Sequence, residues 1–168
     1  MGTDLDRLDT YRMAEHLAQV VWEMVGHWGQ FERQTIGSQI VRAADSVGAN
    51  IAEAHGRFYF GEKLQFLYYA RGSLYETRHW LRLAWRRKLL AHTDSMKIVE
   101  ILDPLAKALN RFASSLKQQR SDTKLKEESA EYGEERRISN LSISNLDDEV
   151  FISQEDIVWL TNFHANVS

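Results

Sequence analysis

The stretch VRAADSVGANIAEAHGR, Val41 to Arg57, has the spacing of an amphipathic helix but an unusual content of Ala, Gly and Ser. Its apolar residues recur three or four positions apart, which is the period of one helix face. Beside them, small residues recur every four positions, at Ala44, Gly48 and Ala52. Because glycine inside a helix costs about 1 kcal/mol relative to alanine, we expect close contact with another helix along this small-residue stripe to offset that cost.

A row of polar residues lies beside the small ones. Asn50, Glu53 and Arg57 recur at spacings of three and four residues, which again is one face of a helix. Buried polar side chains can set the register of neighbouring helices in a bundle. We therefore expect these three residues to form a structural polar stripe that bonds to another helix. A direct contact with a ligand is the alternative.

The same helical rhythm extends over the first 120 residues. The chain contains one proline, and no segment shows the strict alternation of a strand. Apolar residues repeat at helical spacing over about 4–28, 35–55 and 61–90, and again in a fourth segment that follows Thr93. Helices joined by short links pack as antiparallel neighbours. We therefore predict an all-α fold, an antiparallel up-and-down four-helix bundle over residues 1–120.

Three residues are expected to shape the helix ends. Gly56 can adopt the positive φ of a helix C-cap, and Thr93 stands where its hydroxyl would cap the fourth helix. Pro104 falls within the fourth helix. Because proline lacks an amide hydrogen and clashes with the preceding turn, we expect it to kink that helix or to split off its first turns.

Charge is distributed unevenly along the chain. Residues 1–120 hold 17 Lys and Arg against 13 Asp and Glu, whereas residues 121–168 hold 4 against 11, which gives the net charge of −3. The acidic segment also loses the helical rhythm. Because such a segment cannot bury enough apolar surface to offset chain entropy, we expect residues 121–168 to form a mostly disordered acidic tail. A capping-box-like SQED start favours one short helix within it, near 153–163.

The third helical segment concentrates positive charge on one side. At about 100° per residue, its tyrosines and arginines between Tyr68 and Arg86 fall within one sector of the helical wheel. Guanidinium groups bind phosphates, and tyrosines between them can stack on unpaired bases. The predicted nucleic-acid-binding surface comprises Arg71, Tyr75, Arg78, Arg82, Arg86, Arg87 and Lys88. The alternative is a solvated face whose arginines pair with acids of a neighbouring helix or subunit.

Large apolar residues also occur on the far side of this segment, at Phe66, Tyr69 and Trp80. A small bundle has one core, so a helix that is apolar on two sides needs a second partner. The chain also holds five Trp, and aromatic residues are enriched at protein interfaces. We expect the protein to self-associate.

The sequence contains no arrangement typical of an enzyme or a metal site. It has no cysteine, which excludes disulfides and thiolate ligands. Glu76 and His79 have the spacing found in di-iron bundles, but the second Glu-x-x-His motif that such a site needs is missing. No phosphate-binding glycine loop, signal peptide or membrane-spanning apolar run occurs. We expect a non-catalytic cytoplasmic protein without a cofactor or metal.

Two stretches resemble a known protein family. The motifs in SQIVRAADSVGANIAEAHGRF (38–58) and FLYYARGSLYETRHWL (66–81) are similar, in order and spacing, to those of the 23S rRNA intervening-sequence proteins. The resemblance covers about residues 8–118. Ala54 replaces a glycine that is usual in the family, and the segment after Glu76 is more basic than in the typical member. Neither difference changes the expected fold.

The resemblance implies bacterial antiparallel bundles that assemble into homopentameric rings. Some members are encoded within insertions in large-subunit rRNA genes. A related branch consists of accessory proteins of diversity-generating retroelements, which bind nucleic acid and a reverse transcriptase. Three hypotheses follow. The protein is a homo-oligomeric, pentameric scaffold that binds nucleic acid, RNA rather than DNA; or an accessory subunit of a reverse transcriptase; or a protein-interaction module with no nucleic-acid role.

Overall fold

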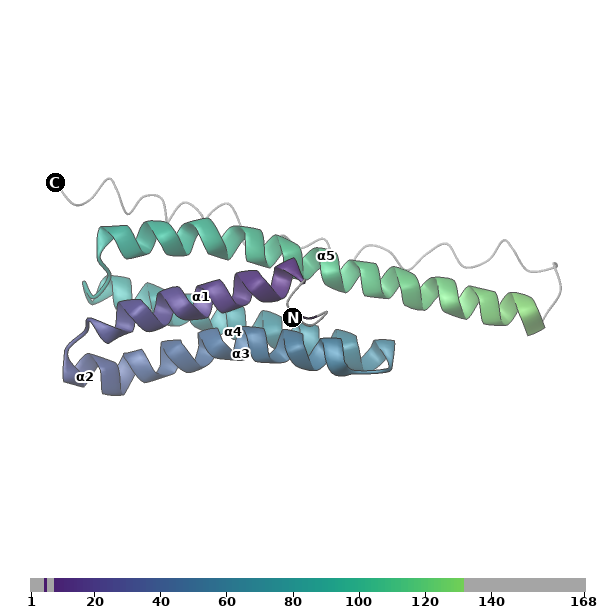
Figure 1. Cartoon of the computed structure of the whole chain (residues 1–168), viewed down its shortest axis with the longest axis horizontal. Coiled ribbons are helices and arrows are strands. Elements are labelled where there is room, and N and C mark those ends of the chain that lie inside the picture. The colour runs from purple at the N-terminus through teal and green to yellow at the C-terminus, as the bar shows by residue number, and fades with distance from the viewer. Residues whose placement is uncertain (1–4, 6–7, 132–168) are drawn as a thin grey trace.

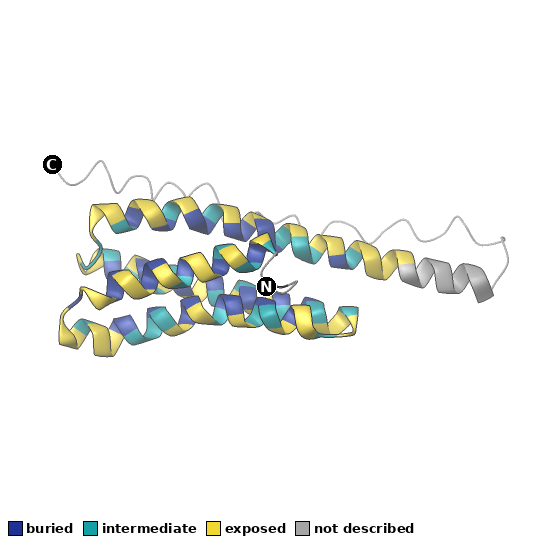
Figure 2. Cartoon of the chain, viewed as in Figure 1, coloured by how far each residue is buried: buried dark blue, intermediate teal, exposed yellow. Residues whose placement is uncertain are grey.

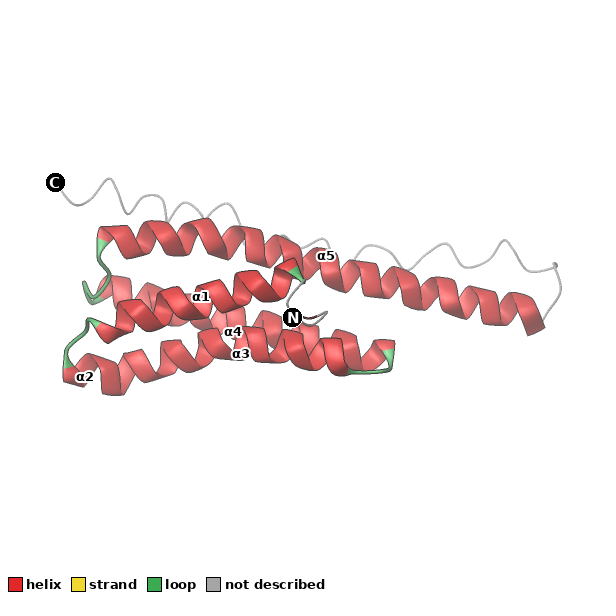
Figure 3. Cartoon of the chain, in the orientation of Figure 1, coloured by secondary structure: helices red, strands yellow, loops and turns green. Residues whose placement is uncertain are grey.

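The computed structural model of the chain describes residue 5 and residues 8–131. Helices make up the regular secondary structure of these residues, and no strand occurs among them (Figure 3). In chain order the elements are α1 (Asp9–Gly26), α2 (Gln30–Glu32), the π-helical segment η2 (Arg33–Gly37), α3 (Ser38–Gly56), α4 (Phe60–Arg86) and α5 (His92–Glu131).

The helices lie side by side (Figure 1). α2, η2 and α3 follow one another without a break and form one rod, so the described chain consists of four rods. α1 packs against α3 and α5, and α4 packs against the same two helices. Because short links join successive rods, each runs opposite to the one before it. This arrangement confirms the predicted antiparallel up-and-down four-helix bundle.

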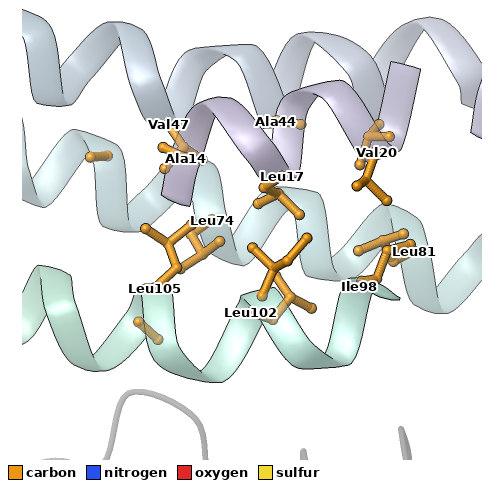
Figure 4. Close-up of a cluster of buried hydrophobic side chains, with 14 of the residues drawn as sticks. Ala14, Leu17, Val20, Ala44, Val47, Leu74, Leu81, Ile98, Leu102 and Leu105 are labelled. Carbon is orange, nitrogen blue, oxygen red and sulfur yellow. The ribbon is translucent and has the colours of Figure 1, made fainter. Parts of the chain in front are cut away.

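The core lies between the four rods, where buried residues face inward (Figure 2). Figure 4 shows Leu17 of α1, Leu74 of α4 and Leu102 of α5 pointing into the same apolar cluster, and all three are almost completely buried. Full burial of such a side chain stabilises the fold by about 1.5–3 kcal/mol. The core therefore depends on apolar faces contributed by every rod.

α1 covers the small-residue stripe of α3. Ala44 and Gly48 are buried, and a Cβ placed on Gly48 would lie 3.8 Å from the Ala14 Cβ and 3.9 Å from the Tyr11 Cε2. These are ordinary van der Waals distances, so a methyl group fits at Gly48. The structure thus confirms that another helix lies against this stripe.

A closer approach occurs at a glycine that sequence reasoning did not single out. A Cβ on Gly37, in η2, would lie 2.8 Å from the Val25 Cγ1 and 3.0 Å from the carbonyl oxygen of Glu32. One contact is with the backbone, which cannot move aside as a flexible side chain can. The π-helical turn therefore requires glycine at this position, although its backbone angles are ordinary for a helix.

Two predicted helix ends are wrong. No described glycine has a positive φ, and α3 ends because Arg57 leaves it in an extended conformation, with φ −76° and ψ 146°. Thr93 lies inside the first turn of α5, which starts at His92. The carbonyl of Ala91 already accepts the backbone N–H of Ser95 at 3.1 Å, so the helix begins before Thr93.

α5 is longer than predicted. Pro104 lies within it, but the helix is not split there. It continues past Arg120 to Glu131, and its C-terminal part extends beyond the ends of α3 and α4 (Figure 1). The predicted change from bundle to tail at residue 121 therefore falls inside a helix. The rest of the predicted tail, with the expected short helix near 153–163, lies outside the described residues.

Candidate nucleic-acid interface

α4 presents its predicted basic residues on the surface of the bundle. Leu67, Leu74 and Leu81 recur every seven residues and are buried in the core, which fixes the orientation of the helix. Its cationic side chains consequently point away from the core. Arg71 and Arg78 are half-buried, while the other five predicted residues are exposed, namely Tyr75, Arg82, Arg86, Arg87 and Lys88.

Cations stack on two tyrosines of this surface. The guanidinium carbon of Arg71 lies 5.2 Å from the centre of the Tyr68 ring, and that of Arg78 lies 5.6 Å from the centre of the Tyr75 ring. The Nζ of Lys117, on α5, lies 5.7 Å from the Tyr68 ring centre. A cation stacked on a ring face is held in place, and a guanidinium in this position can still donate hydrogen bonds from its edge.

The group of cations and tyrosines therefore spans two helices, α4 and α5. Lys117 could not be found from the helical wheel of α4, because a wheel contains no information about a neighbouring helix. We use the name basic surface for the residues Tyr68, Arg71, Tyr75, Arg78, Arg82, Arg86, Arg87, Lys88 and Lys117. Its C-terminal half is one-sided in charge, since no Asp or Glu occurs between Glu76 and Asp94.

The end of α4 carries an unusual backbone conformation. Lys88 has φ 60° and is the non-glycine residue with positive φ among the described residues. Its N–H bonds to the carbonyl of Trp85 at 2.8 Å, and the N–H of Leu89 bonds to the carbonyl of Ala84 at 3.0 Å. These two bonds make a Schellman motif, in which glycine normally occupies the left-handed position.

A lysine in the left-handed position is costly. For residues other than glycine, this conformation costs roughly 1–2 kcal/mol. Backbone strain of this kind collects at functional sites. Lys88 is exposed and directly follows Arg86 and Arg87, so the turn keeps three consecutive cations at the end of the basic surface.

The predicted polar stripe links α3 to α4. Asn50 Nδ2 donates to the carbonyl oxygen of Ser46 at 2.8 Å and, across the helix pair, to the Ser73 Oγ at 3.4 Å. Arg57 pairs with Glu53 at 2.6 Å, and its guanidinium carbon lies 4.6 Å from the centre of the Phe66 ring on α4. Asn50 and Arg57 thus each contact α4, as a role in helix register requires.

The large apolar residues on the far side of α4 are less exposed than predicted. Phe66 and Trp80 are half-buried and pack against the core. Trp80 also donates its Nε1–H to the Glu76 Oε1 at 3.2 Å. Among the three residues, only Tyr69 is half exposed. The second apolar side predicted on α4 is therefore partly covered within the single chain, and Tyr69 remains exposed on it.

Other aromatic side chains are exposed instead. Phe58 is 86% exposed and Tyr59 is 67% exposed, in the short link between α3 and α4. Their rings meet edge to face, with centres 5.3 Å apart. Trp22 on α1 and Phe31 on α2 are also largely exposed. Periodicity does not mark these residues, because they lie near helix ends or on the polar side of their helix.

A shallow groove of about 430 Å³ lies between α1 and α3. Small residues line its floor, and Trp22, Glu15 and Asp45 stand along it. Burial raises the pKa of the Asp45 carboxyl above its usual value by desolvating the charged form.

Within the described part of the chain, no three His, Asp or Glu residues gather as a metal site would require. No described helix is long and apolar enough to span a bilayer.

These residues define a class of protein, a four-helix bundle in which an Asn and an Arg link α3 to α4 and cations lie along α4. In a comparison with protein families, residues 6–111 match the family described as 23S rRNA-intervening sequence protein. The chain belongs to this family, as the resemblance predicted. The match covers α1 to α4 and the first half of α5. A comparison with curated proteins gives no match.

Proposed function

We propose that this protein is a non-enzymatic, homo-oligomeric scaffold that binds nucleic acid through the basic surface. The observation that supports this proposal best is the C-terminal part of α4, where Arg78, Arg82 and the Arg86–Lys88 run are exposed or half-buried with no intervening carboxylate. Neutralising phosphates with such cations releases condensed counterions, which is the main source of affinity in nucleic-acid binding.

The proposed ligand is RNA rather than DNA, and single-stranded rather than duplex. Tyr68 and Tyr75 are partly exposed and lie between the cations, an arrangement that suits stacking on unpaired bases. A continuous duplex keeps its bases stacked on one another, so the faces of the bases are not available to aromatic side chains. The family's description refers to 23S rRNA, which favours RNA.

The proposed assembly is a homopentamer. Phe58, Tyr59, Trp22 and Phe31 are exposed in the single chain, and large exposed aromatics are typical of interfaces. A ring of five copies would repeat the basic surface around one particle. Several weak phosphate contacts would then act together on one RNA chain, which raises the apparent affinity without any new contact.

A role in protein interaction is the second candidate, and the groove between α1 and α3 favours it. The groove combines a floor of small residues with Trp22 at its side, which suits a helix of another protein. An accessory subunit of a reverse transcriptase would use such a surface in addition to its basic one. A reverse-transcriptase gene beside this gene would support that version.

Fluorescence anisotropy with a single-stranded RNA over a salt series tests the proposed function. We expect Arg78→Gln with Arg82→Gln to weaken binding and to flatten the dependence of log Kd on log salt, by about 0.7 for each phosphate that is no longer neutralised. The matched control is Arg33→Gln with Arg42→Gln, which removes the same charge from exposed positions of η2 and α3. Equal binding by both double variants would contradict the assignment. A change in oligomer size in the first variant alone would instead favour arginines that pair across a subunit interface.

A further inference from the structure

The basic surface is matched in charge by a segment of the same chain. From Thr77 to Thr93 the chain contains five Arg and Lys and no Asp or Glu. Residues 132–168, which follow α5 and lie outside the described residues, contain seven Asp and Glu against two Arg, a net charge of −5. Two stretches of opposite charge are therefore held on one polypeptide.

The chemistry of residues 132–168 also matches the stacked tyrosines. Its acids are interleaved with large apolar residues, as in LDDEVFISQEDIVWL at 146–160. Carboxylates can pair with guanidinium groups much as phosphates do, and Phe151 and Trp159 offer rings for stacking on arginine. This segment thus presents the two chemical features that single-stranded RNA presents, namely negative charges and flat rings.

The segment is long enough to reach every part of the basic surface. It starts at the end of α5, which projects beyond α3 and α4 (Figure 1). α5 has 40 residues and is therefore about 60 Å long at 1.5 Å per residue. Residues 132–168 can extend over about 120 Å at 3.3 Å per residue. Since the segment is tethered, its effective concentration at the surface is in the millimolar range.

We propose that the acidic segment 132–168 docks on the basic surface of its own chain and competes there with nucleic acid. The docking does not depend on the proposed function; the competition rests on it. A segment that occupies the surface nine-tenths of the time lowers the apparent affinity for RNA about tenfold. Ligands with few charges are then rejected, while an RNA that contacts several cations at once displaces the segment.

A spin label in the full-length chain tests the docking without any RNA. Because the chain has no cysteine, Ser153→Cys gives one site for a nitroxide whose mobility is read by electron paramagnetic resonance. We expect an immobilised label at low salt and a mobile label at about 1 M salt, where screening is nearly complete. Arg78→Gln with Arg82→Gln should release the label, and the control pair Arg33→Gln with Arg42→Gln should not. A label that is mobile in every case, or equally immobile in every case, would overturn the docking.

RNA binding tests the competition separately. The variant replaces the seven acids with their amides, at Glu134, Glu135, Asp147, Asp148, Glu149, Glu155 and Asp156. None of the seven belongs to the core of the described residues. We expect this full-length variant to bind single-stranded RNA about tenfold more tightly than the natural sequence. Equal affinity would overturn the competition. An immobilised label in a protein that binds no RNA would leave the docking standing and refute the proposed function.

Discussion

Replacing Lys88 by glycine and by alanine separates the strain of the α4 end from its charge. Both variants remove the ammonium group, which is exposed and forms no ion pair with a described residue. Both also remove its favourable interaction with the C-terminal end of the helix dipole, worth about 0.3–1 kcal/mol. Only glycine relieves the cost of φ 60°, because alanine retains a Cβ that clashes in the left-handed region.

The expected difference in stability between these two variants is about 1 kcal/mol. The left-handed conformation costs alanine about 1–2 kcal/mol, and the greater freedom of glycine in the unfolded chain offsets about 0.4–1 kcal/mol of this advantage. For a cooperative unit the size of this bundle, 1 kcal/mol corresponds to a shift in Tm of about 3–5 °C. We therefore expect Lys88→Gly to melt at a higher temperature than Lys88→Ala by that amount.

Thermal melts followed by circular dichroism, at one fixed protein concentration, measure this difference. RNA binding should fall equally in both variants, with the salt slope reduced by up to about 0.7 if Lys88 contacts one phosphate. Identical Tm values would refute the strain argument. If both variants bind RNA as tightly as the natural sequence does, Lys88 does not belong to the binding surface, and its conformation has no functional explanation.

Three further predictions concern packing, pH and assembly. Gly37→Ala should destabilise the protein by about 1–3 kcal/mol through overpacking. Gly48→Ala should instead be neutral, or stabilise the protein by up to about 1 kcal/mol through helix propensity. Equal denaturant midpoints for the two variants would show that the 2.8 Å approach to Val25 is readily relieved. The raised pKa of Asp45 means that this carboxyl binds a proton more tightly in the folded state than in the unfolded state. The contribution of Asp45 to stability is therefore present below its unfolded pKa and is lost as pH rises through its folded pKa. Asp45→Asn should consequently raise Tm at pH 7 and have little effect near pH 3, and a larger effect at pH 3 would contradict the sign. Light scattering at micromolar concentration should give a mass several times the 19.5 kDa of one chain, and a monomeric mass would remove the proposed assembly.

Residue spacing determined the helical class and the direction in which each helix faces. Leu67, Leu74 and Leu81 alone orient α4, because the helical period converts a spacing of seven residues into one face. The cations between them must then lie elsewhere on the helix, and the structure places them on the surface. Family membership was equally accessible, since its motifs are local runs of residues within α3 and α4.

Contacts between distant parts of the chain were decided only by the tertiary structure. Lys117 reaches the Tyr68 ring because α5 lies beside α4, and Phe66 is partly covered because Arg57 turns onto it from the end of α3. The helix ends also escaped prediction. Whether Gly56 or Lys88 adopts a positive φ depends on the direction in which the chain must leave to reach the next helix. Local propensity carries no information about that direction. The residue types therefore predicted the helices, but not the turns at their ends or the surfaces formed jointly by two helices.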